Sequence, residues 1–393
     1  MKKPTFAPWP SFDAEIIDAV KSVLVSGKVS QWTGTNVYAF EKEYAQYLGV
    51  KHAIAMANGT VTLDAALKVL GIGPGDEVVV SSRSFVASAS CVAYAGALPV
   101  FADIDGSSGN MTKETIEAVL TKKTKAVIVV HLAGWPCDMD PIVQLCQSRK
   151  LCLIEDCAQA HGALYKGRPV GTFGDFASFS FCQDKIFTTG GEGGLLVTND
   201  PRRWKKAWSL KDHGRDYDVV FNQTSGTSFK WMVNSFGTNN RMTEIQAAIG
   251  RIMLKRLDEM VGKRRQHAVF FDAAFKKMEG LVVPVVPSEI KHSYYKYYVY
   301  VDPKKLKAGE SRDTILQELS ALGVPCGSGA CPEIYREKAF RDQRKKMSLS
   351  AQKHLSVSKK LGETSIMLQV HPTLSSDSIH YVIDSMKSVF KKD

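Results

Sequence analysis

The feature that most constrains the fold is an alternation of short apolar strands with helical segments in the first half of the chain. Strand-like runs rich in Val and Ile are separated by segments of helical periodicity and by Gly/Pro turns. We expect strands over 77–81, 99–103, 125–131 and 151–156. Apolar strands that alternate with helices indicate an α/β fold, with a mainly parallel sheet covered on both faces.

The second half of the chain has a different pattern. Beyond Thr243 a long amphipathic helix is predicted to continue toward Phe275. A later strand and helix, expected over 294–301 and 313–322, indicate a smaller α+β unit. At 393 residues the chain is longer than one typical domain. We therefore predict a large domain at 1–250, which includes the N-terminal segment, and a small C-terminal domain at 251–393.

Composition excludes several classes of protein. A hydrophobic fraction of 44% and a charged fraction of 23% are ordinary for globular proteins, not for disordered or fibrous ones. No run approaches the roughly 18 apolar residues of a membrane-spanning helix. The N-terminus also lacks the apolar segment of a secretory signal, so we expect a cytoplasmic protein with no membrane partner. The eight cysteines form no C-x-x-C pair, and no metal site is expected.

The charge balance suggests an anionic partner. The chain has 51 Lys and Arg against 40 Asp and Glu, a net charge of +11. Such proteins attract nucleic acids, acidic membranes or phosphorylated metabolites. The basic residues form short clusters, such as 202–206 and 263–265, which are more often solvated helix faces than binding patches. A non-enzymatic DNA-binding regulator stays a remote alternative, because no helix-turn-helix context is recognisable.

Two polar segments stand at a helix start and a strand end, where open α/β sheets bind ligands. Gly59 and Thr60 follow Asn58 and precede a helical run; glycine permits close backbone approach, and a helix N-terminus favours an anion. Taken alone, this segment is more simply a helix cap. Asp156 ends an apolar strand, and a buried carboxylate is costly unless a cation or donors meet it. It is either a helix cap or the counter-ion of a protonated ring nitrogen.

Lys185 lies between an aromatic β-like run at 177–181 and a glycine-rich turn at 188–194. A partly desolvated lysine amine loses its proton readily and becomes a nucleophile suited to Schiff-base formation. For an isolated lysine, a surface position beside a hairpin is the simpler interpretation. The glycine run lacks the G-x-x-x-x-G-K-[ST] spacing of a nucleotide P-loop, so ATP hydrolysis is rejected. A further polar segment, 237–244, exceeds what a helix cap at Thr243 needs.

Together these segments supply an anion cradle, a buried acid, a nucleophilic lysine and further phosphate donors, as pyridoxal 5′-phosphate (PLP) requires. In the order of these segments and in their residues, the chain resembles the DegT/DnrJ/EryC1/StrS family of PLP-dependent nucleotide-sugar aminotransferases, a branch of the aspartate aminotransferase fold. The resemblance covers nearly the whole chain. Its most specific motifs are Glu155-Asp-Cys-Ala-Gln-Ala160, Phe179-Ser-Phe181 with Lys185, Thr188-Thr-Gly-Gly-Glu-Gly-Gly194 and Gly237-x-Asn239-x-Arg241-Met242.

This resemblance implies a PLP-dependent transferase of fold type I: a mostly parallel seven-stranded sheet between helices, plus a smaller α+β C-terminal domain. It also implies that Lys185 binds the cofactor covalently and that Asp156 partners the pyridine nitrogen. Phe85 would lie over the ring, although without the resemblance a core aromatic is the simpler interpretation. The other implied contacts are Gln159 with the phenolic oxygen, and Gly59, Thr60 and Ser180 with the phosphate. Asn239 would reach the phosphate of a neighbouring subunit, which implies a homodimer with shared active sites.

The implied activity is amino transfer, most simply from L-glutamate, to a nucleotide-linked keto-deoxysugar used for O-antigen, other lipopolysaccharide or antibiotic sugars. Sugar dehydratases of the family have histidine at the position of Lys185, which favours a transaminase here. The glycine turn favours C4 of a 4-keto-6-deoxyhexose. Amination of a C3 keto sugar or of a non-sugar cyclic ketone stays open, because the segments 182–184 and 190–191 and Asn240 depart from the common family pattern.

Overall fold

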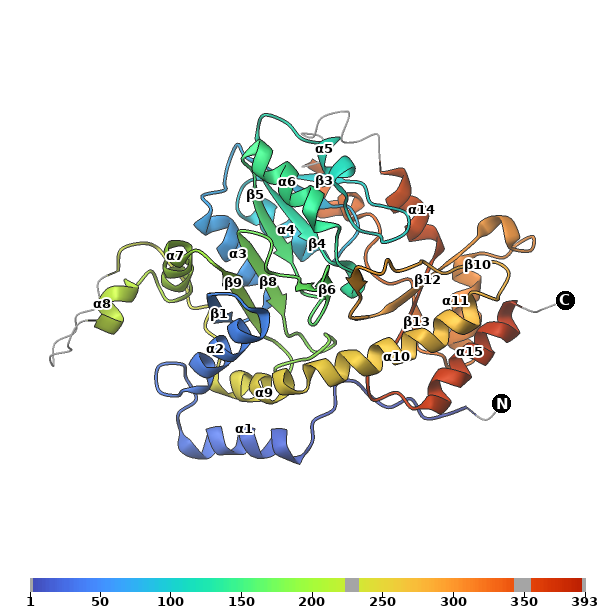
Figure 1. Cartoon of the computed structure of the whole chain (residues 1–393), viewed down its shortest axis with the longest axis horizontal. Helices are drawn as coiled ribbons and strands as arrows, with labels where there is room; N and C mark the ends of the chain where they lie inside the picture. The colour runs from blue at the N-terminus through green and yellow to red at the C-terminus, as the bar shows by residue number, and fades with distance from the viewer. Residues whose placement is uncertain (1–2, 223–232, 343–354, 391–393) are drawn as a thin grey trace.

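A computed structural model describes residues 3–222, 233–342 and 355–390 and has a seven-stranded sheet at its centre (Figure 1). The strand order is β1-β9-β8-β5-β4-β2-β3. Among these strands, β9 alone runs antiparallel to its neighbours, so the predicted mostly parallel α/β sheet is confirmed. The strands are β1 (His52–Met56), β2 (Glu77–Ser81), β3 (Leu98–Ala102), β4 (Thr124–Val130), β5 (Cys152–Asp156), β8 (Phe176–Ser180) and β9 (Gly194–Thr198).

Helices cover both faces of this sheet, and each face has its own apolar core. In β1, Ile54 and Met56 pack into one core while Ala53 and Ala55 pack into the other, because successive strand side chains point to opposite faces. The first core is shared with α3 (Gly59–Val69), α4 (Ala87–Tyr94), α6 (Met139–Arg149) and α7 (Pro201–Lys211). The second is shared with α1 (Ala14–Ser26), α2 (Asn36–Leu48) and α9 (Glu244–Lys255).

A second, four-stranded antiparallel sheet belongs to the C-terminal part of the chain, where the smaller α+β unit was expected. The third apolar core of the molecule lies against this sheet and is packed by the end of α10 and by α15. The elements are β10 (Leu281–Val282), β12 (Tyr297–Val301), β13 (Cys326–Gly327), β14 (Ser365–Leu368), α11 (Arg312–Ala321), α14 (Ser356–Thr364) and α15 (Ser376–Phe390). The domain boundary after residue 250 stays a prediction.

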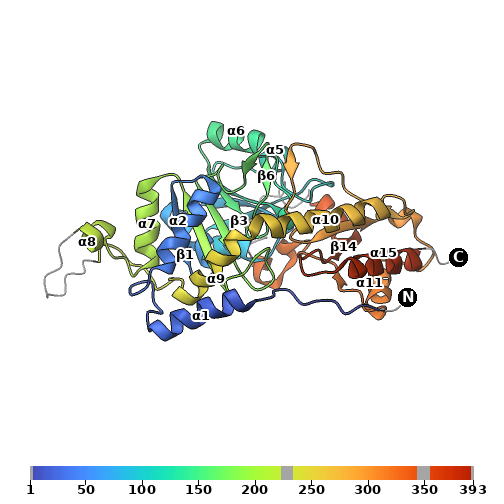
Figure 2. The ribbon, with the colours of Figure 1, turned by 60° about the horizontal axis from the view of Figure 1, so that its bottom comes forward.

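The long helix predicted beyond Thr243 is two helices, so the prediction of a continuous one was wrong. Thr243 caps α9 as expected, but Arg256 interrupts the run with φ −94° and ψ −1° before α10 (Leu257–Phe275). The Arg256 side chain pairs there with Asp13 and Glu15 at the start of α1. Figures 1 and 2 show α10 running from the large sheet to the small one, with the N-terminal segment alongside it.

Shorter elements complete the described part of the chain. A three-stranded sheet joins β11 (Ile290–Lys291), β6 (Leu164–Tyr165) and β7 (Arg168–Pro169), and the short helices are α5 (Lys113–Glu117) and α8 (Tyr217–Asn222). No helix among the described residues is both long and apolar enough to cross a bilayer. The cytoplasmic location stays a prediction.

Candidate active site

A cavity of about 810 Å³ opens at the carboxyl ends of β5 and β8 and is closed on its far side by residues of the small sheet. This is the position where open α/β sheets bind ligands, and the volume is in the usual range for ligand pockets. Seven of the eight predicted site residues line it: Gly59, Thr60, Phe85, Asp156, Gln159, Ser180 and Lys185. Segments that are far apart in the sequence thus meet in one place.

Asp156 ends β5 with its carboxylate buried against the cavity wall. One carboxylate oxygen accepts a hydrogen bond from the Ser88 hydroxyl at 2.7 Å, and the other accepts one from the Ala158 amide at 3.1 Å. Burial raises the pKa of this carboxyl, whereas the two hydrogen bonds and the nearby Lys185 lower it. No helix begins here, so the helix-cap alternative for Asp156 was wrong. Asp156 instead lines the cavity.

The backbone beside Lys185 is fixed by two groups that sequence reasoning missed. The Trp9 indole donates a 2.8 Å hydrogen bond to the Lys185 carbonyl oxygen, across 176 residues of sequence. Arg264 of α10 is buried and donates to the carbonyl oxygens of Tyr295, at 3.2 Å, and Ile186, at 3.5 Å. The half-buried Lys185 side chain lines the cavity, which contradicts a plain surface position.

The start of α3 combines both interpretations of its polar segment. Asn58 is a helix cap, because its side-chain oxygen accepts from the amides of Thr60 and Val61 at 3.1 Å. Gly59 also allows a close approach: a Cβ built on it would lie 2.6 Å from Ser180 Cβ and 3.2 Å from Ser180 Cα. Only glycine therefore brings the helix start against Ser180, and the amides and hydroxyls of this corner are suited to an anion.

Gln159 and Phe85 also line the cavity. The Gln159 side-chain oxygen accepts a 2.8 Å hydrogen bond from the Ala133 amide, so its NH₂ group is held in a defined direction. Phe85 is 62% exposed although it lines the cavity. The interpretation of Phe85 as a core aromatic was therefore wrong.

Asn239 is the predicted site residue that the structure does not bring into the cavity. It is exposed and bridges to Asp212 through its backbone, beyond the sheet edge formed by β1. Its neighbour Phe236 is 94% exposed, which is unusual for a large apolar side chain. In this structure Asn239 lies outside the cavity.

A buried cluster beneath the cavity superficially resembles a metal site. Nitrogen, oxygen and sulfur atoms of His131, Glu155 and Cys157 lie within 4.8 Å of one another. However, Glu155 already accepts from the amides of residues 171, 173 and 174, each at 2.7 Å. His131 Nδ1 accepts from the Cys137 amide, so Nε2 carries the proton and donates to Glu155 at 3.1 Å. Burial also raises the pKa of the Cys157 thiol, so the cluster is a hydrogen-bonded brace rather than a set of metal ligands.

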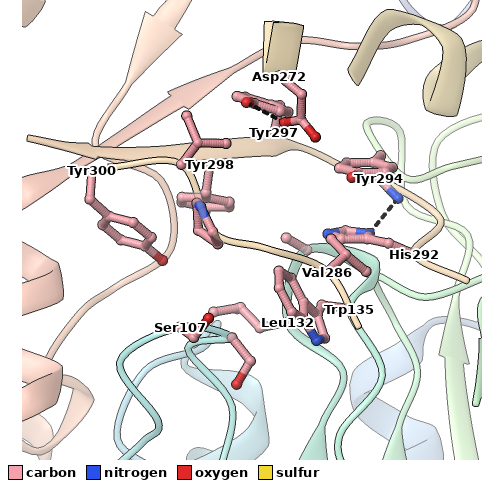
Figure 3. A pocket seen from close by; sticks show the side chains of 14 residues that line it. Ser107, Leu132, Trp135, Asp272, Val286, His292, Tyr294, Tyr297, Tyr298 and Tyr300 are labelled. Carbon is pink, nitrogen blue, oxygen red and sulfur yellow. Dashed lines mark hydrogen bonds between the residues drawn. The ribbon is translucent and has the colours of Figure 1, made fainter. Parts of the chain in front are cut away.

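A second cavity, of about 30 Å³, lies between the two sheets (Figure 3). Tyr300 of β12 faces Leu132 and Trp135 across it, whereas Tyr297 points to the other side of the strand and donates a hydrogen bond to Asp272 of α10. It has room for about one water molecule. We interpret this cavity as aromatic packing between the sheets, with Tyr298 shared between it and the large cavity.

Comparisons with known proteins agree with this geometry. The model of the DegT/DnrJ/EryC1/StrS aminotransferase family matches residues 10–387. GDP-perosamine synthase of Caulobacter vibrioides is 39% identical over 80% of this chain and 81% of its own length. The dTDP-4-dehydro-2,3,6-trideoxy-D-glucose 4-aminotransferase of Saccharopolyspora spinosa is 30% identical over 96% and 94%. The crystal structure of an aminotransferase from Psychrobacter cryohalolentis superposes with a TM-score of 0.95, at 50% identity and 98% and 99% coverage.

Proposed function

This chain belongs to the DegT/DnrJ/EryC1/StrS family of PLP-dependent aminotransferases, and we propose that it transfers the amino group of L-glutamate to C4 of a nucleotide-linked 4-keto-6-deoxyhexose. Family membership establishes the enzyme class and the cofactor, and it sets aside the DNA-binding alternative. The observation that carries the proposal is the meeting of Lys185 and Asp156 in one cavity beside the glycine-bounded start of α3.

The residues present fit the cofactor. PLP needs an amine for its aldehyde, an acid for its ring nitrogen and an anion site for its phosphate, and Lys185, Asp156 and the corner of Gly59 and Ser180 match these needs. The cofactor, when bound, supplies an electron sink for the carbon that loses a proton. Because Asn58 already accepts from the Thr60 amide, we expect the hydroxyls of Thr60 and Ser180 and the Gly59 amide to hold the phosphate.

Asp156 and Lys185 have distinct roles in this proposal. With PLP bound, the Asp156 anion, which Ser88 and Ala158 hold by hydrogen bonds, would favour the protonated form of the pyridine nitrogen. The Lys185 amine would hold the cofactor covalently and, once free, would carry the proton from the α-carbon of the amino donor to the cofactor. Hydrogen bonds from Trp9 and Arg264 to the adjacent backbone keep this amine aimed into the cavity.

We propose further that two subunits share their active sites. Asn239 and Phe236 are exposed outside the cavity, as expected for side chains that contact a neighbouring copy. Exposed apolar residues of α1, namely Ile17, Leu24 and Val25, support such a homodimer. Mixing an Asn239→Ala protein with a Lys185→Ala protein tests the arrangement. Partial recovery of activity in the mixture is expected, and no recovery in proven heterodimers would contradict shared sites.

The function is tested by assaying amino transfer from L-glutamate to dTDP-, UDP- and GDP-linked keto sugars and to non-sugar cyclic ketones. Transfer to a 4-keto-6-deoxy sugar is expected. Preference for a 3-keto sugar or for a cyclic ketone would replace the proposed acceptor while leaving the reaction class intact. The Lys185→Ala protein should lack the visible absorbance of covalently bound PLP, and Asp156→Asn should lose most turnover. Retention of that absorbance without Lys185 would overturn the assignment of the lysine.

A further inference from the structure

A second lysine, Lys296, lines the same cavity as Lys185. It enters from the small sheet, directly before β12, and its side chain is 12% exposed. Its amine lies 4.8 Å from the centroid of the Tyr295 ring, and the Lys185 amine lies 4.9 Å from the same centroid. Two amines therefore adjoin one aromatic ring on the cavity wall, but only one of them is needed to hold PLP.

The strand register explains how Lys296 is oriented. Tyr297 of β12 pairs with Leu368 of β14, which places Lys296 next to Gln369. The Lys296 amine donates a 2.9 Å hydrogen bond to the Gln369 side-chain oxygen. Asp184 is the nearest carboxylate, at 3.7 Å, and it also accepts the hydrogen bond of the Tyr295 hydroxyl. An ammonium group has three hydrogen-bond donors. The Lys296 amine uses one of them on the neutral Gln369 amide, and its carboxylate neighbour Asp184 is 3.7 Å away and shared with Tyr295. The amine therefore has donor capacity left for an anionic ligand.

We propose that Lys296 binds the α-carboxylate of the amino-acid donor, an inference that rests on the proposed transaminase function. The donor must place its α-carbon at the Lys185 amine for proton transfer, and its α-carboxylate is bonded directly to that carbon. The carboxylate must therefore be met by a group close to Lys185. In a nucleotide sugar the diphosphate is attached at C1, with most of the pyranose ring between it and C4, so it extends toward the cavity mouth. An amine beside the same ring as Lys185 suits the carboxylate better.

The electrostatic surroundings support this role. Burial lowers the pKa of Lys296 to about 8; Asp184 opposes this effect, and Arg264 and Lys185 add to it. The amine is then mostly protonated at neutral pH but is only partly neutralised by its neighbours. A desolvated cation of this kind gains more from a new anionic partner than an exposed lysine does.

The test compares wild-type, Lys296→Met and Lys296→Arg holoenzymes, with Lys291→Met as a matched control at an exposed lysine nearby. The donor half-reaction is followed by the visible absorbance of bound PLP, using L-glutamate and its α-amide. For Lys296→Met we expect kcat/KM with L-glutamate to fall about 10- to 100-fold, as for loss of a charge-assisted hydrogen bond. The value with the α-amide should change less than threefold, and Lys296→Arg should retain most of the preference for glutamate.

Direct binding separates this inference from the proposed function. Calorimetry with L-glutamate and its α-amide is carried out on Lys185→Ala, which cannot turn over, and on Lys185→Ala/Lys296→Met. Weaker glutamate binding in the double variant, with the α-amide unaffected, supports the role of Lys296 even if no keto sugar is ever aminated. Equal losses for both probes, or the absence of any preference for glutamate over the α-amide with Lys296 present, would overturn it. If Lys296→Met instead slows amino transfer to the sugar while the donor half-reaction is unchanged, the amine contacts the sugar nucleotide and the proposal is wrong.

Discussion

The Ser88 hydroxyl donates a 2.7 Å hydrogen bond to Asp156, and it does so from α4, a helix that is otherwise part of the sheet packing. This bond favours the carboxylate form of a buried acid whose pKa burial raises. The small side chain of Ser88 thus helps to set the protonation state on which the proposed role of Asp156 depends.

Replacing Ser88 by Ala should lower kcat about 10- to 100-fold, because a hydrogen bond to a charged group contributes roughly 1.5–3 kcal/mol. The Asp156 pKa should rise further, so activity should decline at higher pH than in the wild type when the solution is acidified. Steady-state kinetics across pH with a saturating donor measure both effects. Ser90→Ala, at a half-buried serine of the same helix, is the control, and equal activity of the two variants would refute the role of Ser88.

A second prediction concerns the stability of the pair Lys211 and Glu41, which joins α7 to α2. The Lys211 amine is fully buried, 3.8 Å from a Glu41 oxygen and 2.9 Å from the Gln31 side-chain oxygen. Lys211→Met leaves the Glu41 carboxylate, whose side chain is only 14% exposed, without its cation, and the loss of such a partner costs roughly 3–5 kcal/mol. Denaturant unfolding should show this loss, whereas Lys206→Met, at an exposed lysine of the same helix, should change stability by less than about 0.5 kcal/mol. A double variant with Glu41→Gln should recover part of the loss, and a neutral effect of Lys211→Met alone would contradict the argument.

Most strands of the large sheet could be predicted, because each is specified by a short contiguous run of residues. The strand expected over 77–81 is β2 with the same bounds. The other strands expected in the large sheet, together with the β-like run at 177–181, differ from the observed ones by one residue at most ends. The strand β1 was missed because its sequence, His-Ala-Ile-Ala-Met, contains little of the β-branched and aromatic content typical of strands.

The site was predictable in so far as its motifs are contiguous. Lys296, Arg264 and Trp9 gave no local signal, because their importance arises only when the small sheet and the N-terminal segment meet the large sheet. Phe236 likewise became visible as a candidate contact only through its exposure. The hydrogen bonds of Lys296 to Gln369, Arg264 to Ile186 and Trp9 to Lys185 span 73, 78 and 176 residues of sequence. Tertiary packing sets such contacts, and the periodicity of a single sequence does not encode them.

A third prediction concerns acid stability and the buried His161. Its Nε2 donates to the Ser180 carbonyl oxygen at 2.8 Å and its Nδ1 accepts from the Tyr44 hydroxyl at 2.7 Å, so the ring is neutral. Burial lowers the pKa of His161 to about 3 from an ordinary value of 6.5. Below pH 6.5 the unfolded chain therefore binds a proton that the folded protein excludes. The contribution of neutral His161 to the free energy of unfolding is fully present above pH 6.5. It is lost as the pH falls toward 3, by up to about 1.4 kcal/mol per pH unit.

Urea unfolding of wild type and His161→Gln at a series of pH values between about 4 and 8 measures this contribution. The variant should be less stable at neutral pH, because it loses the bonds to Tyr44 and Ser180, but its stability should fall less steeply on acidification. Buried His292 also has a pKa of about 3 and should retain its own share of the slope in both proteins. Parallel slopes for the two proteins would show that His161 is not excluded from protonation.

The last prediction compares Gly59, where the absence of a side chain allows close packing, with Gly262, where a side chain has free space. In Gly59→Ala the new Cβ would lie 2.6 Å from Ser180 Cβ and 3.2 Å from its backbone Cα, so the start of α3 and the β8 end must move apart. Since this corner is where we propose that the phosphate binds, PLP affinity should fall at least tenfold. Gly262→Ala is the matched control: no atom lies within 4 Å of its Cβ on α10, and alanine should stabilise that helix by up to about 1 kcal/mol. PLP titration of the apo-proteins, followed by absorbance, gives the affinities, and thermal unfolding gives the stabilities. Weakened PLP binding confined to Gly59→Ala is expected, because the close approach is needed at that corner alone; unchanged PLP binding in Gly59→Ala would place the phosphate elsewhere in the cavity.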